Sequence, residues 1–128
     1  MDDPYSPFTP GSTHRMLAFL PFFERGMFKT ANEHYLQTGQ NTPHVDRLVA
    51  EIYDSGFALP FDWTNWNAES ALARLEHADL QALRKLLTAF ARGDRMSGGT
   101  LAALCADGTI ERVLRRLKTL AETKTAAR

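Results

Sequence analysis

The four histidines and the single cysteine are the residues best suited to binding a metal or attacking a substrate. His14, His34, His44 and His77 lie in separate segments, and none has another ligand type four positions away. We favour surface positions for them, with a metal site built from distant histidines as the alternative. Cys105 lies in an apolar stretch, a pattern typical of a buried thiol rather than a nucleophile. The sequence therefore predicts no metal, no cofactor and no catalytic residue.

The segment Phe57–Trp66 (FALPFDWTNW) combines two tryptophans, two phenylalanines and a carboxylate. In one interpretation it is a buried connector, with Asp62 capping a turn or pairing with an arginine. In the other it is an exposed patch, and Asp62, Trp63 and Trp66 contact a partner. The buried form is favoured because a domain of this size needs its aromatic residues for the core.

Arg84, Thr88, Arg92 and Arg95 are spaced to lie along one stripe of a helix. Arginine can hold a carboxylate or phosphate through two hydrogen bonds, so the stripe can either form internal salt bridges or bind an anionic partner. We predict a structural role for Thr88 and Arg92 and a partner-binding role for Arg95. The candidate internal acids are Glu51, Asp54 and Asp62.

The last predicted helix carries Arg112, Arg115, Arg116 and Lys118 opposite its apolar face. Such a face is most often solvated, but it is also typical of a helix that contacts phosphates, so the three arginines are partner-binding candidates. Residues 1–83 have a charge balance of −6 and residues 84–128 one of +6, giving a net charge of zero. The two halves can neutralise each other within one fold or mark an interaction surface.

Three segments combine an apolar stripe at helical spacing with a capping residue. Thr42–Pro43 begins the first, and Gly56 closes it. Asp79 begins the second, which should stop at Gly93, and Thr109 caps the third. The predicted helices span residues 42–55, 79–92 and 109–121.

Other elements have weaker patterns. The expected capping residues of shorter helices are Ser12 or Thr13, Asn65 or Asn67, and Thr100. Pro21 should end or kink the first helix. One short strand pair can involve residues 34–38 or 57–61. The predicted fold is mainly α, a compact bundle of five to six helices.

The length of 128 residues predicts one domain, organised as a flexible Pro-rich arm at 1–11, a helical domain at 12–123 and a flexible end at 124–128. The single cysteine favours a reducing compartment. The longest apolar stretch is too short to span a membrane, and no signal peptide pattern precedes it. We therefore expect a cytoplasmic protein.

Three stretches form a recognisable set: Phe19–Glu24 (FLPFFE), Gly56–Trp63 (GFALPFDW), and Leu83–Lys118, which contains LRKLLTAFARGDRMSGGTLAAL and ERVLRRLK. Together they resemble a family of small bacterial proteins catalogued as a domain of unknown function. The most specific residues are Thr88, Arg92, Arg95, Gly99 and Leu101. The resemblance implies a bacterial or phage-borne protein and lends no activity.

Three functions remain open. We expect a non-enzymatic protein-binding module whose partner is another protein, such as a stoichiometric inhibitor of a bacterial defence complex of the anti-CRISPR kind; this rests on size and analogy. The alternative is a nucleic-acid-binding protein that uses the basic C-terminal half, which the neutral charge balance disfavours. An enzyme of unrecognised type is third, because no catalytic motif is present. The sequence leaves the oligomeric state open.

Overall fold

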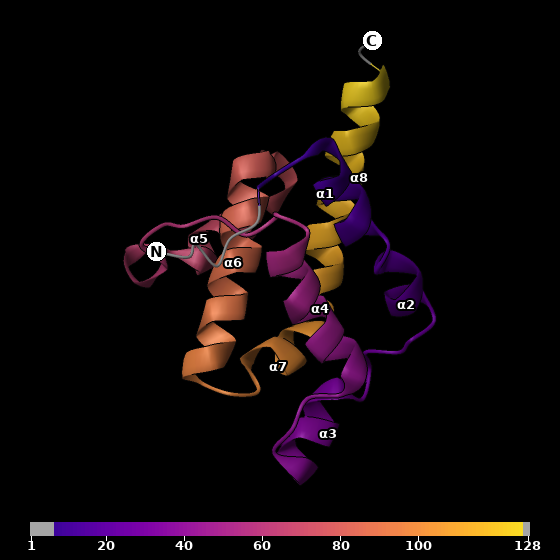
Figure 1. The fold of residues 1–128 in the computed structure, drawn as a ribbon, viewed down its shortest axis with the longest axis vertical. Helices are drawn as coiled ribbons and strands as arrows, with labels where there is room; N and C mark the ends of the chain where they lie inside the picture. The colour runs from indigo at the N-terminus through magenta and orange to yellow at the C-terminus, as the bar shows by residue number, and fades with distance from the viewer. Residues whose placement is uncertain (1–6, 127–128) are drawn as a thin grey trace.

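The chain folds into packed helices, and the computed structural model describes residues 7–126 (Figure 1). The elements are α1 (Pro10–Leu17), α2 (Leu20–Glu24), α3 (Ala31–Thr38), α4 (Pro43–Asp54), η1 (Trp63–Asn65), α5 (Ala68–Ala73), η2 (Leu75–His77), α6 (Leu80–Met96), α7 (Thr100–Ala106) and α8 (Thr109–Ala126). The mainly α prediction is confirmed. The described residues contain no strand, and no helix among them combines the length and apolarity needed to cross a membrane.

The core lies where α6 and α8 meet the shorter helices. α4, α5 and α7 pack against α6, while α1, α2 and α7 pack against α8. Each long helix turns one apolar stripe inward, as its residue spacing predicts. The largest fully buried side chains are Met16, Phe28, Leu48, Ile52, Phe57, Leu83, Leu86, Leu87, Leu101, Ile110, Leu114 and Leu117.

The expected strand at residues 34–38 is wrong, because this stretch belongs to α3. It has no long apolar stripe, and it packs mainly against α7, which is distant in the sequence. Ala31 is fully buried, and the ring of Tyr35 lies against Gly98 and Gly99 at the start of α7. Gly39 then ends α3 in the left-handed conformation. Tertiary packing therefore decides the conformation of a segment whose local preference is weak.

Several helix caps occur as predicted. Thr42 accepts a hydrogen bond from the backbone N–H of Val45, and Asp79 does the same for Ala82. Asn67, rather than Asn65, caps α5 by accepting from Ser70. These side chains satisfy donors that a helix N-terminus would leave unpaired.

One predicted helix end and three predicted capping residues are wrong, whereas the predicted start of the last helix at residue 109 is correct. α1 begins at Pro10 after Thr9, so Ser12 and Thr13 lie inside the helix. α6 does not stop at Gly93 but continues to Met96. Asp94 accepts the N–H of Leu101 at the start of α7 (3.0 Å), while Thr100 is already helical. Asp107 likewise accepts the N–H of Thr109 (2.8 Å) at the start of α8.

The first helix ends earlier than the expected break at Pro21: α1 stops at Leu17, and Pro21 sits in the first turn of α2. The separate α2 and the helical α3 raise the number of helices above the five to six expected.

The predicted arm overlaps the described residues only from Pro7. There, a methyl group on Gly56 would lie 2.0 Å from the Pro7 carbonyl oxygen, so the chain crosses Gly56 closely.

Candidate functional site

The aromatic segment is divided between the core and the surface. Phe57 and Ala58 are buried, whereas Phe61, Trp63 and Trp66 are half-buried. Trp66 packs against the hydrophobic core, but Phe61 and Trp63 are not among the described side chains that do so. The buried interpretation therefore applies to the start of the segment and the exposed one to its end. We call residues 60–66 the aromatic turn.

Asp62 holds the backbone of the aromatic turn in shape. Its carboxylate oxygens accept hydrogen bonds of 2.6 Å from the Thr64 hydroxyl and the Asn65 amide. The Thr64 bond, followed by the Asn65 bond, lowers the pKa of the Asp62 carboxyl from its usual value near 3.8. Both oxygens are thus bonded within the turn, which agrees with the turn-capping alternative for Asp62 and not with its pairing to an arginine.

Phe61 is fixed from two sides. Its ring makes an edge contact with Trp66, with the ring centroids 5.6 Å apart. Lys85 of α6 places its ammonium nitrogen 5.6 Å from the Phe61 centroid, within the range of a cation–π contact. Sequence reasoning did not single out Phe61 or Lys85, because the contact joins two distant segments. The turn therefore presents Trp63 beside a ring that is already anchored.

Arg84 attaches the start of the aromatic segment to α6. Its Nε donates to the carbonyl of Phe57 (2.8 Å), and Nη2 donates to those of Gly56 (3.2 Å) and Ala58 (3.4 Å). Its guanidinium carbon lies 4.3 Å from the centroid of the Phe8 ring. Burial lowers the pKa of Arg84. Its described partners are thus carbonyl groups at the end of α4 and an aromatic ring, so the expected salt bridge is wrong for Arg84.

Thr88 and the remaining stripe residues lie further along α6. The Thr88 hydroxyl donates to the carbonyl of Arg84 (2.7 Å) and accepts the N–H of Leu59 (3.1 Å). Arg92 is half-buried, and Arg95 is exposed with its guanidinium carbon 6.0 Å from the Tyr53 ring centroid. Lys85 and Arg95 are separated by about 15 Å along the helix axis. Arg95 therefore lies outside the aromatic turn.

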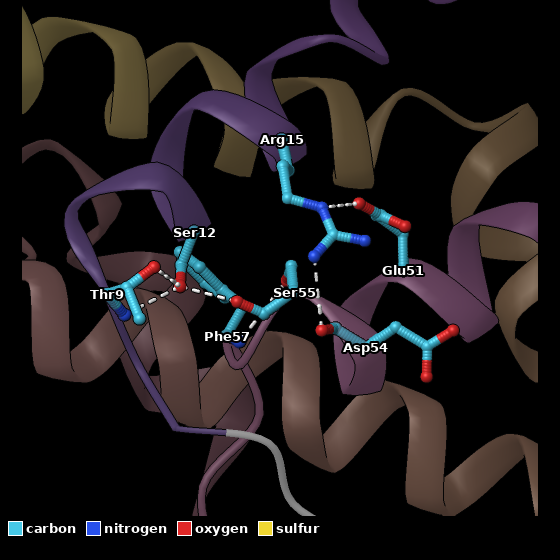
Figure 2. Close-up of polar contacts among 7 residues, drawn as sticks. All are labelled: Thr9, Ser12, Arg15, Glu51, Asp54, Ser55 and Phe57. Carbon is cyan, nitrogen blue, oxygen red and sulfur yellow. Dashed lines mark hydrogen bonds and ion pairs between the residues drawn. The ribbon is translucent and has the colours of Figure 1, made fainter.

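Of the acids proposed as partners of the stripe, Glu51 pairs with Arg15 of α1 instead, and Asp54 contacts the same arginine through its backbone carbonyl (Figure 2). Arg15 pairs with Glu51 through Nε and donates from Nη1 to the backbone carbonyl of Asp54 (3.2 Å). Beside this pair, the buried Ser12 hydroxyl donates to the Ser55 carbonyl, and the Ser55 hydroxyl accepts the N–H of Phe57 (3.2 Å). These bonds join the beginning of α1 to the end of α4, from which the aromatic segment departs.

Three arginine candidates meet at a second surface. Arg112, Arg115 and Arg116 line an open groove of about 340 Å³ between η2 and α8, together with Leu75, Glu76 and Thr119. Arg115 donates two hydrogen bonds to Glu111, of 3.0 and 2.7 Å. This hydrogen bonding raises the pKa of Arg115. Arg116 donates from Nε to the carbonyl of Ala78 (3.0 Å). The two features are separate: the aromatic turn contains η1 and packs against α6, whereas the groove lies between η2 and α8.

Comparison with known proteins gives one match. Residues 9–123 match the model of a family described as a family of unknown function (DUF6508). The chain belongs to this family. The resemblance found in the sequence is thereby confirmed, and the DUF6508 region includes both the aromatic turn and the arginine groove. No curated protein and no solved structure matches the chain significantly.

Two further reactive side chains of this DUF6508 protein, His44 and Cys105, pack among other residues of the fold. His44 packs beside Phe22 and Phe28, with ring centroids 5.5 and 5.9 Å away. Within residues 7–126 no group of three or more His, Cys, Asp and Glu side chains is arranged to hold a metal ion. Cys105 is buried; burial raises the pKa of its thiol, and the nearby carboxylates of Asp94 and Asp107 raise it further.

Cys105 should therefore be unreactive while the protein is folded. A raised pKa keeps the thiol protonated through the neutral range, and the thiolate is the nucleophile. We expect a maleimide to label the native protein at least about a hundredfold more slowly than the protein unfolded in denaturant at the same pH. Mass spectrometry over time gives both rates, and equal rates would contradict the buried environment.

Proposed function

We propose that the protein is a non-enzymatic protein-binding module and that the aromatic turn is its contact surface. The observation that carries the proposal is the position of Phe61 and Trp63, which are half-buried without packing against the core described for residues 7–126. Tryptophan in particular is enriched among the residues that dominate binding energy at protein interfaces. An aromatic side chain that the fold does not use for its core is available to a partner.

The rigidity of the turn supports this function. Asp62 is bonded to Thr64 and Asn65, and Phe61 is held between Trp66 and Lys85. Ordering a loop on binding costs free energy, so a turn that is already ordered retains more of its contact energy as affinity. The partner surface should be an apolar pocket large enough for an indole ring, with a donor placed to reach the charged Asp62.

A more specific role remains part of this proposal. A small chain with its contact surface on a single turn suits stoichiometric inhibition of a larger assembly. Inhibition of a defence complex, in the manner of an anti-CRISPR protein, is one such role, and it rests on size and analogy.

Trp63→Ala tests the surface directly. We expect it to cost about 1 kcal/mol of stability or less, against about 3–5 kcal/mol for truncation of a core tryptophan. Trp66→Ala, which removes a ring packed against the core, should destabilise the fold clearly more. Thermal unfolding of both variants measures the difference. A Trp63→Ala protein that unfolds as readily as Trp66→Ala would show that both rings serve the core.

The binding measurement uses the same variant. Tagged wild-type and Trp63→Ala proteins are used to capture partners from a lysate of the native host, and the purified partner is then titrated by calorimetry. We expect affinity to fall by about thirtyfold, the effect of losing a dominant interface residue. Leu36→Ala is the matched control, because Leu36 is 76% exposed on α3. Equal capture by the wild type and Trp63→Ala would refute the proposed surface.

A further inference from the structure

The groove between η2 and α8 combines an apolar floor with basic walls. Leu75 lies at its base with only 5% of its surface exposed, and Arg112 and Arg116 rise from one face of α8. Residues four apart on a helix are neighbours, separated by about 6 Å along the axis. The two guanidinium groups can therefore act on one ligand segment.

Two of the three guanidinium groups are held in place before any ligand arrives. Arg116 lines the groove and uses Nε for the carbonyl of Ala78, which leaves the donors on its two terminal nitrogens for a ligand. Arg115 is fixed by its two bonds to Glu111. A side chain that is already ordered loses less conformational freedom on binding, which increases the affinity obtained from each new hydrogen bond.

The charge of the groove selects an anionic ligand. Arg112, Arg115 and Arg116 contribute three positive charges to its lining and Glu76 one negative charge, while Glu111 pairs with Arg115. Within residues 7–126, the positive charges of Arg112 and Arg116 have no such carboxylate partner. Planar guanidinium groups bind carboxylates and phosphates through paired hydrogen bonds. Leu75 adds an apolar contact that a simple inorganic anion would not use. The lining therefore fits a segment with several anionic groups and an apolar side chain.

We propose that this groove binds an acidic segment of a protein partner, with Arg112 and Arg116 as the main contacts. The site is separate from the aromatic turn and does not rest on it. A protein segment is favoured over a nucleic acid because Glu76 and Glu111 stand beside the arginines. They would repel a continuous phosphate backbone, whereas a peptide can place its carboxylates between them. The net charge of zero also differs from the strongly basic surface typical of nucleic-acid binders.

Fluorescence anisotropy with defined probes tests the site. The probes are a labelled peptide of alternating glutamate and leucine, the same peptide with glutamine in place of glutamate, and a single-stranded DNA oligonucleotide. The proteins are the wild type, the double variant Arg112→Gln/Arg116→Gln, Lys118→Gln and Trp63→Ala. Lys118 is the matched control because it is an exposed cation of α8 outside the groove. Circular dichroism verifies that each variant retains the helical fold.

We expect the wild type to bind the glutamate peptide at least about tenfold more tightly than the glutamine peptide, as charge-assisted pairs should provide. The double variant should lose this preference, while Lys118→Gln and Trp63→Ala keep it within about twofold. Added salt should weaken binding of the glutamate peptide only. Equal binding of the two peptides would overturn the proposal. So would tighter binding of the oligonucleotide that disappears in the double variant, since the ligand would then be a nucleic acid.

Discussion

Arg84→Met should lower the free energy of unfolding by about 3 kcal/mol, since a hydrogen bond from a charged donor contributes about 1.5–3 kcal/mol and buried acceptors are left unpaired. The guanidinium group donates to the carbonyls of Gly56, Phe57 and Ala58, all of which are buried residues. Methionine preserves most of the aliphatic length but donates nothing. The segment that follows α4 would lose these three hydrogen bonds to α6.

Chemical denaturation of the wild type and Arg84→Met measures this effect. Arg74→Met is the control, because Arg74 is an exposed arginine whose removal should change stability by only about 0.5 kcal/mol. Because Arg84 also lies over the Phe8 ring, the variant should release Phe8, and limited proteolysis near the start of α1 should accelerate. Equal unfolding midpoints for the two variants would contradict the role assigned to Arg84.

Gly99→Ala should have a comparable effect for a different reason. Gly99 has a φ of +91°, and an alanine methyl group would lie 2.7 Å from two atoms of the Tyr35 ring. The left-handed conformation costs a non-glycine residue about 1–2 kcal/mol. Displacing a packed ring adds about 1–3 kcal/mol. We expect a total loss of about 3 kcal/mol in the free energy of unfolding, because α3 must move away from α7.

Gly39→Ala separates the two contributions. Gly39 also has a positive φ, of +73°, but nothing lies within 4 Å of the added methyl group. Its loss of stability therefore reports backbone strain alone. A double-mutant cycle between Gly99→Ala and Tyr35→Ala should show that part of the damage disappears when the ring is absent. Additive effects of those two substitutions would show that the ring and the glycine do not interact.

The helices that position the core were predictable because their signals are local. Thr42 and Asp79 each accept a backbone N–H three residues ahead, and the apolar stripes that follow are long enough to be unambiguous. The short helix α3 was not predictable, because its stability depends on the Tyr35 ring reaching Gly98 and Gly99 far along the chain. The helix end predicted at Gly93 was wrong, because a glycine with a negative φ can remain within a helix.

The candidate surfaces were predictable as residue types but not as arrangements. The sequence indicated that Trp63 could be buried or exposed, and only the packing of Trp66 against the core distinguishes the two tryptophans. It placed Arg84 in a stripe with Arg92 and Arg95. The acceptors of Arg84 could not be predicted, because they are backbone carbonyl groups, which every residue carries. The groove beside α8 needs Leu75 and Glu76, which belong to a turn with no recognisable motif.

The packing of α1 and α2 against α8 has a consequence for biosynthesis. Translation releases these two helices well before α8, the last helix of the described chain (Figure 1). Met16, Phe19 and Phe23, which are buried in the finished fold, emerge from the ribosome without the surface that covers them. The core therefore closes only after α8 has emerged. Until then, these apolar side chains form an attachment site for chaperones or for other nascent chains, so a slower supply of α8 would favour aggregation.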